Sequence, residues 1–342
     1  MDSITSLILK DKREAREEFF INLFELCNLK CSFCWQDHND KRGMDTVRDK
    51  AQVIIDRLIE RKKYTNGFDI NLMGGELFFD EINDSLFDDY FYLAKKVNEY
   101  CTANSIEVSF NWVTNLVFTK TQRVLKLQSD LIDEGVDSML TTSYDPRGRF
   151  NTKNFNLFLK NIDIVRLHLR SVGIVMTRPN IMAIMKGDSK LQSLYKKIDL
   201  YFDYYSPEES FKTSLPKDSE LLVFFKYMLQ NYPKAEPFRS WRENDINKMT
   251  CRSSNVILPD GGGGKCRSLV AKSLYDEFLS EFDVKDNDSM EKSFIERRNC
   301  LTCEFFQKCG LGCFLQSDFL KHNDLEDCLF YLTFKEIQGE EV

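Results

Sequence analysis

The sequence has no long apolar run, because no stretch approaches the roughly 20 apolar residues that a membrane-spanning helix needs. Residues 1–18 mix acidic and basic side chains around a short apolar run, Leu7-Ile8-Leu9, and so lack the apolar core of a signal peptide. Positive charge is not in excess either, since the 342 residues carry a formal net charge of -7. Nucleic-acid binding depends on clustered Lys and Arg. We therefore expect neither a membrane nor a nucleic acid as the main partner.

Internal repeats are absent too, and the one low-complexity tract is the four glycines at 261–264. The apolar content of 42% is that of a globular chain, long enough for one large domain and a smaller one. Cysteine, in contrast, is abundant, with 11 residues. Without an export signal these thiols indicate a reducing cytoplasm, where they serve as metal ligands rather than in disulfides.

Three cysteines within residues 27–34 are the most informative feature of the chain: Cys27, Cys31 and Cys34. Three thiolates on one short loop can bind three irons of a cubane cluster and leave the fourth iron open for another ligand. A zinc site needs four ligands, and His38 is the nearest candidate for the fourth. A disulfide with a spare thiol is a third interpretation.

Apolar runs of strand length alternate with helical patterns from residue 18 to residue 204. The predicted strands are 18–26, 68–73, 106–113, 138–144, 171–176 and 199–204. The predicted helices are 46–62, 87–101, 121–134, 155–167 and 189–197. Strands separated by helices favour an α/β fold with a parallel sheet. Six units predict a partial, TIM-like (β/α)6 barrel, open on one side, with its working residues at the carboxyl ends of the strands.

The pattern changes near residue 206, where a predicted helix at 219–231 is followed by cysteine-rich and turn-rich sequence. We predict a partial barrel over 1–206, a helical connector over 207–247 and a small cysteine-rich domain over 248–342. Residues 258–261 are predicted to form a turn between two short strands. Because a domain of this size buries little apolar core, bound metal is expected to supply much of its folding free energy.

The spacing of Cys27, Cys31 and Cys34, with Phe33 directly before the last cysteine, resembles the radical S-adenosylmethionine (radical SAM) family. In that family the open iron of a 4Fe-4S cluster is chelated by the amino and carboxylate groups of the methionine part of SAM. An electron from the reduced cluster then releases a 5′-deoxyadenosyl radical, which takes a hydrogen atom from the substrate. The resemblance implies the same cluster and cofactor here.

The same resemblance implies which residues contact SAM. Phe33 corresponds to the aromatic position beside the adenine, although simple loop packing would also explain it. Gly74, Gly75 and Glu76 end the second predicted strand and look like the motif that contacts the methionine amino group, although such a tripeptide can be an ordinary turn. Ser143 stands at the end of the fourth strand, where relatives contact the carboxylate or ribose, and helix capping is the plainer interpretation.

Seven later cysteines follow one another in an order that resembles the SPASM extension of radical SAM proteins, a C-terminal region that binds two auxiliary clusters. The resemblance implies that the first auxiliary cluster is ligated by Cys251, Cys266 and Cys313, and the second by Cys300, Cys303, Cys309 and Cys328. The last iron of the first auxiliary cluster is then either open or bound by a group other than cysteine, such as a carboxylate or a substrate atom. Taken alone, the pair Cys300 and Cys303 would suit zinc equally well. Cys101, in a predicted helix, is expected to be a buried structural thiol, although a hydrogen-donating role is conceivable.

The two resemblances together imply a radical SAM iron–sulfur enzyme with three 4Fe-4S clusters. Its expected substrate is a peptide or protein, oxidatively modified by a cross-link, a thioether, epimerisation or side-chain oxidation. Arg267 follows Cys266, where the sulfatase-maturating members carry an Asp, and this departure counts against formylglycine formation.

The partners are inferred in the same way. About 17 residues precede the first predicted strand, too few for a leader-binding domain. Either a separate leader-binding protein is expected, or the substrate is a peptide without a leader. A reductant such as flavodoxin or ferredoxin is expected to supply electrons. Two other functions stay open: radical modification of a small molecule or nucleoside, and a non-catalytic zinc-binding interaction protein.

Overall fold

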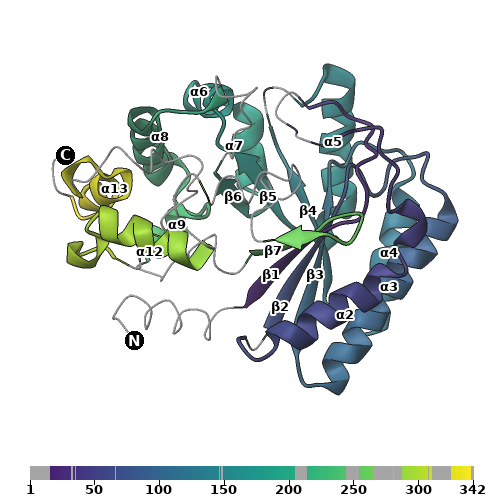
Figure 1. The fold of residues 1–342 in the computed structure, drawn as a ribbon. Coiled ribbons are helices and arrows are strands. Elements are labelled where there is room, and N and C mark those ends of the chain that lie inside the picture. The colour runs from purple at the N-terminus through teal and green to yellow at the C-terminus, as the bar shows by residue number, and fades with distance from the viewer. Residues whose placement is uncertain are drawn as a thin grey trace.

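An eight-stranded sheet forms the centre of the computed structural model (Figure 1), in the strand order β6-β5-β4-β3-β2-β1-β7-β8. The structure describes residues 16–31, 34, 36–65, 67–145, 147, 149–204, 214–243, 254–264, 280, 287–306, 308–309 and 325–339. The strands are β1 (Glu17–Asn22), β2 (Gly67–Met73), β3 (Glu107–Thr114), β4 (Ser138–Ser143), β5 (Leu169–Val175), β6 (Leu200–Asp203), β7 (Ser254–Ile257) and β8 (Gly263–Gly264). Strands β1 to β6 are parallel and neighbour one another in chain order, which confirms the predicted α/β partial barrel.

Helices connect the parallel strands, and α2, α3, α4 and α5 pack side by side on one face of the sheet (Figure 1). The helices are α2 (Lys50–Arg61), α3 (Asp84–Ala103), α4 (Thr121–Asp133), α5 (Thr152–Val165), α6 (Arg178–Met185), α7 (Ser189–Tyr195), α8 (Asp218–Asn231), α9 (Phe238–Arg242), α12 (Asn287–Arg297) and α13 (Leu329–Ile337). Short 3-10 turns are η1 (Met44–Thr46), η2 (Arg166–His168), η4 (Cys300–Thr302) and η5 (Leu325–Asp327). In α4 the buried Val124, Leu127 and Leu131 recur at helical spacing, so one apolar face covers the sheet.

Helix α6 was not predicted by the sequence analysis, and neither were α9, α12 and α13. Strand β5 ends at Val175, and Thr177 then caps α6 by accepting a hydrogen bond from the backbone N–H of Asn180. Pro179 stands in the first turn of this helix, where its missing N–H costs nothing. Thr177 as N-cap and Pro179 in the first turn are together a local signal for the start of a helix, and this signal is stronger than the apolar run that precedes it.

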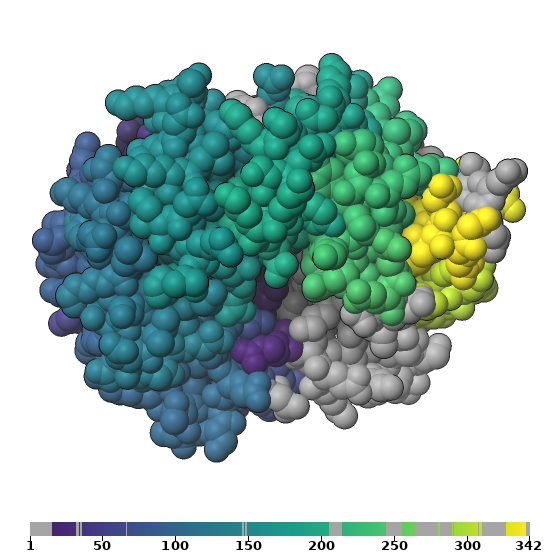
Figure 2. Space-filling view, turned by 180° about the vertical axis from the view of Figure 1, so that it is seen from behind, coloured from purple at the N-terminus to yellow at the C-terminus, as the bar shows by residue number. Residues whose placement is uncertain are grey.

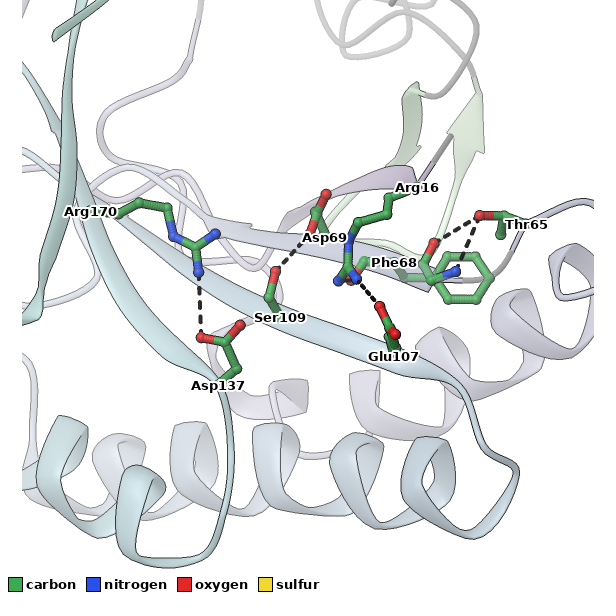
Figure 3. A network of polar contacts seen from close by, with 9 residues as sticks. Arg16, Thr65, Phe68, Asp69, Glu107, Ser109, Asp137 and Arg170 are labelled. Atoms are coloured by element: carbon green, nitrogen blue, oxygen red, sulfur yellow. Dashed lines mark hydrogen bonds and ion pairs between the residues drawn. The ribbon is translucent and has the colours of Figure 1, made fainter. Parts of the chain in front are cut away.

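The two ends of the sheet differ in chemistry. Figure 3 shows an ion-pair network at the amino ends of the strands, where Arg16 contacts Asp69 and Glu107, each at 2.9 Å. Arg170 pairs with Asp137 at 3.4 Å at the same end. The side chains of these ion pairs are partly exposed, and each charge faces one of opposite sign. The carboxyl ends of the strands instead surround a cavity.

Strands β7 and β8 form a short antiparallel pair that extends the barrel sheet, since β7 lies parallel to β1. Their turn is the predicted one, closed by a hydrogen bond of 3.0 Å from the Gly261 N–H to the Leu258 carbonyl. Lys50 of α2 donates from Nζ to the Leu258 carbonyl at 3.3 Å and to the Pro259 carbonyl. The turn between Cys251 and Cys266 in the sequence is thereby fastened to the barrel, and the three-part domain division stays a prediction.

Helices α8, α9, α12 and α13 form a group beside β6 and away from α2, α3 and α4 (Figure 1). The space-filling view (Figure 2) shows residues 214–243, in green, between the teal barrel helices and the yellow C-terminal segment. Helix α8 packs against α13, and Lys226 pairs with Glu336 at 2.9 Å across this contact. Helix α8 of the predicted connector therefore packs both on α6 of the barrel and on α13.

Candidate functional site

The loop of residues 27–34, here called the first cysteine loop, follows β1 at the carboxyl edge of the sheet. Its backbone is held by hydrogen bonds from Cys27 N to the His38 carbonyl, at 2.9 Å, and from Cys34 N to the Cys31 carbonyl, at 3.1 Å. The three thiols line one cavity of about 210 Å³. The strand ends contribute the other walls, with Met73, Gly74, Gly75, Val113, Thr114, Asn115, Ser143, Gly173, Ile174, Val175, Tyr201, Asp203 and Tyr204.

Burial dominates the electrostatics of the three thiols. It raises the pKa of Cys27 to about 12 and also raises the pKa values of Cys31 and Cys34. The thiols raise one another's pKa by repulsion between their charged forms, so they lie within electrostatic reach. The Arg149 guanidinium opposes this effect at Cys31 and Cys34. Three half-buried thiols around a shared cavity fit an iron–sulfur cluster with one open iron.

A single zinc ion fits these residues less well. Zinc holds its sulfur ligands about 2.3 Å from the metal, so the ligands crowd together. In the part of the chain that the structure describes, no three Cys, His, Asp or Glu side chains gather closely enough to share one metal ion. His38 lines the cavity, as its candidacy required. In a cubane cluster each thiolate binds a different iron, so the thiols need only surround the cluster.

Gly74 and Gly75 continue from β2 along the segment that leads from β1 into the cysteine loop. Gly75 N donates to the Phe24 carbonyl at 2.9 Å. A Cβ on Gly75 would lie 2.1 Å from the Leu26 carbonyl oxygen, and one on Gly74 would lie 2.8 Å from that of Phe24. Only glycine permits this close backbone approach. Both glycines line the cavity, where the predicted methionine contact would be made.

The Glu76 side chain is fully buried, with 0% exposed. Its Oε1 accepts hydrogen bonds from the Thr114 hydroxyl at 2.7 Å and from the Phe78 N–H at 3.1 Å, and Oε2 accepts from the Asn115 N–H at 2.5 Å. Burial nevertheless raises the pKa of Glu76 to about 7, because the three donors only partly offset desolvation. The carboxylate thus ties β2 to the end of β3, and its predicted contact with SAM stays a prediction.

Arg149 is a site residue that the sequence analysis missed. Its Nη1 donates to the Ser143 hydroxyl at 2.6 Å, and its Nε lies 3.1 Å from Asp145 Oδ2. Burial raises the pKa of Asp145, and the paired carboxylate and nearby thiols keep the guanidinium charged. Ser143 and Arg149 both line the cavity. The sequence around Arg149 carries no signal that separates it from a surface arginine.

A second pocket, here called the four-cysteine site, contains the four thiols predicted to bind the second auxiliary cluster: Cys300, Cys303, Cys309 and Cys328. Burial and repulsion from the other three thiols together raise the pKa of Cys300 to about 12, so the four thiols lie within electrostatic reach of one another. Arg298 donates to the Cys328 sulfur at 3.9 Å. Phe294, Phe305, Phe306, Phe330 and Tyr331 complete the wall. Four thiols in an aromatic shell fit a fully ligated cluster.

The remaining predicted residues fall into two groups. Phe33, Cys251, Cys266 and Cys313 lie outside the described residues. Cys101 is buried on α3 and packs in the hydrophobic core, where burial raises the pKa of its thiol to about 11. It is not among the described residues that line the cavity.

In the described parts of the chain, no helix has the length and apolar character required to cross a membrane. No protein-family model matches the chain, and no curated protein matches it. Solved structures do match. The structure of hexahistidine-tagged anSMEcpe with bound AdoMet gives a TM-score of 0.59 at 14% identity, over 95% of this chain and 97% of that one. Native anSMEcpe with bound AdoMet gives 0.57 at 15% identity, over 94% and 96%.

A further solved structure, that of SuiB from Streptococcus suis, gives a TM-score of 0.50 at 15% identity, over 91% of this chain and 76% of that one. These likenesses extend over nearly the whole chain and include both the barrel and the C-terminal region. At such low identity they establish the architecture and leave the chemistry to the residues described above. The chain therefore has the fold of anSMEcpe and SuiB.

Proposed function

We propose that this protein is a radical SAM enzyme with auxiliary iron–sulfur clusters that oxidatively modifies a peptide or protein. The observation that carries the proposal is the presence of two separate thiol sets, each lining its own pocket, on one fold. Three thiols lie at the carboxyl ends of the parallel strands, and four lie in a second pocket. The likeness to anSMEcpe, whose solved structures contain AdoMet, supports the choice of cofactor.

The cavity residues divide the work of holding the cofactors. Cys27, Cys31 and Cys34 would ligate the cluster that binds SAM. The backbone of Gly74 and Gly75 would approach the methionine part, together with Glu76, and Phe33 would lie beside the adenine. The buried cation of Arg149, with the hydroxyl of Ser143, would attract a carboxylate. The bound cluster and SAM supply hydrogen-atom abstraction, while the protein orients the substrate and excludes water.

The four-cysteine site would hold one auxiliary cluster. Cys251, Cys266 and Cys313 would hold another, which makes three 4Fe-4S clusters in all. Auxiliary clusters can accept the electron that leaves when a substrate is oxidised, with a potential set by ligation and burial. The peptide substrate follows from the SPASM resemblance, and a cytoplasmic reductant such as flavodoxin or ferredoxin, with a separate leader-binding protein, completes the proposed system.

The test is anaerobic reconstitution with iron and sulfide, followed by an iron count and an assay for 5′-deoxyadenosine. We expect about twelve irons per chain and reductive cleavage of SAM. Replacement of Cys34 by Ala should abolish cleavage while the auxiliary irons remain. The matched change Cys303→Ala should remove about four irons and leave SAM cleavage in place. Zinc in place of iron, with no cleavage, would overturn the proposal and favour an interaction protein.

The substrate class is tested on the reconstituted protein. A peptide library and a panel of nucleosides and small metabolites are each incubated with SAM and reductant, and mass spectrometry searches for loss of two hydrogens. We expect such products from peptides alone. Products confined to the small molecules would replace the peptide part of the proposal.

A further inference from the structure

Two aromatic rings connect the cavity with the four-cysteine site. Tyr204 directly follows β6 and lines the cavity, whereas Phe330 is in the first turn of α13 and lines the four-cysteine site. Their ring centroids are 6.2 Å apart, and the ring planes meet at 70°. This edge-to-face contact is of the favourable kind. Among the residues that the structure describes, it is the one aromatic pair whose members line both sites.

Neighbouring elements hold both rings in place. Phe330 is 6% exposed and packs edge-on against Trp241 of α9, at 6.0 Å between centroids. Tyr204 leaves a strand whose Phe202 is packed between Phe224 of α8 and Phe238 of α9, each at 5.7 Å. The contact therefore joins a barrel strand to the helix that begins directly after Cys328.

This inference rests on the proposed function. Oxidative modification removes one hydrogen atom from the substrate in the cavity, and then one further electron and one proton. The proton goes to solvent, and the electron must reach an acceptor. We propose that the Tyr204–Phe330 ring pair is the route by which this electron passes from the cavity to a cluster at the four-cysteine site, which is reduced by one electron. Phe330 is buried and Tyr204 is half-buried, so the two rings in contact bridge the sites through packed protein and not through a solvent gap.

The chain offers a matched control outside both sites. Tyr227 of α8 is not among the described residues that line either site, and its ring packs on Tyr232 with 6.2 Å between centroids. A change at Tyr227 therefore removes an aromatic contact of the same spacing without touching either site. The variant Tyr204→Phe keeps the ring and removes only the hydroxyl. Tyr204→Leu and Phe330→Leu remove the ring from either side.

The experiment follows electron redistribution between clusters in the reconstituted full chain. Substoichiometric dithionite is added, and freeze-quench electron paramagnetic resonance records the reduced clusters with time, using Cys34→Ala and Cys303→Ala chains as reference spectra. Iron content is counted in every variant. We expect Tyr204→Leu and Phe330→Leu to slow redistribution by an order of magnitude. Tyr204→Phe and Tyr227→Leu should redistribute electrons at the wild-type rate.

Four results would overturn the inference. The first is a wild-type rate in both ring-deleted variants, and the second is equal slowing in Tyr227→Leu. The third is slowing in Tyr204→Phe as large as in Tyr204→Leu. The fourth is loss of iron from both ring-deleted variants, which would indicate a structural role. A failure of the proposed function is distinguishable, because the wild-type chain would then bind no iron. Loaded clusters with unchanged kinetics would overturn the electron route alone.

Discussion

The buried carboxyl of Glu76 gives the sharpest test of the site's electrostatics. Its pKa rises from 4.5 to about 7 because burial outweighs its three hydrogen bonds. The folded chain therefore keeps this proton to higher pH than the unfolded chain does. The resulting stabilisation is fully present below about pH 4.5 and is lost as pH rises through about 7. Since each pKa unit corresponds to about 1.4 kcal/mol, the loss amounts to about 3 kcal/mol.

The perturbation is Glu76→Gln, which cannot ionise. We would measure the free energy of unfolding by urea for the metal-free, reduced wild type and variant, at a series of pH values from about 4.5 to about 8. Other buried acids, such as Asp145, titrate in both chains and cancel in the difference. The amide of the variant faces the Asn115 N–H, which adds a constant cost of about 1–3 kcal/mol.

The free energy of unfolding of the wild type, minus that of Glu76→Gln, should fall by about 3 kcal/mol as the pH rises over this range. The companion change Thr114→Val removes the hydroxyl that donates to Glu76 at 2.7 Å. Loss of this donor should raise the pKa of Glu76 further and increase the loss of unfolding free energy between low and high pH. A difference that stays constant with pH, or that grows, would refute the reasoning that desolvation controls this carboxyl.

Three other changes test separate parts of the structure. In Gly75→Ala the new Cβ would meet the Leu26 carbonyl oxygen at 2.1 Å, so urea unfolding should show a loss of about 1–3 kcal/mol, and unchanged stability would contradict the close approach. Cys27 must lose the proton that its raised pKa retains, so cluster loading should release protons and proceed faster at about pH 9 than at about pH 7. A rate of loading independent of pH would argue against thiol ligation. Cys101→Ser buries a hydroxyl in the core, so it should cost about 1–3 kcal/mol on urea unfolding and leave the iron count unchanged; lost iron would show that this thiol is a ligand.

Elements with a strong local pattern were predicted closely. The second strand, expected at 68–73, is β2 (Gly67–Met73), and the helix expected at 121–134 is α4 (Thr121–Asp133). Both bury an apolar face of regular spacing, which the sequence displays directly. Helix α6 was missed because its cap and proline were given less weight than the preceding apolar run. The pairing of β7 with β1 could not be foreseen, since it joins segments more than two hundred residues apart and depends on the closure of the whole sheet.

The sequence by itself determined the architecture and was enough to predict the thiol sets. Spacing within a short loop is a local property, so Cys27, Cys31 and Cys34 needed no tertiary information to be predicted as one ligand set. Tertiary structure alone decided what surrounds them: the glycine approach at Gly75, the buried pair of Arg149 with Asp145, and the ring contact that links the two sites. Such contacts join chain segments that local periodicity does not relate. They follow from how strands and helices pack, and packing is settled by the whole core at once.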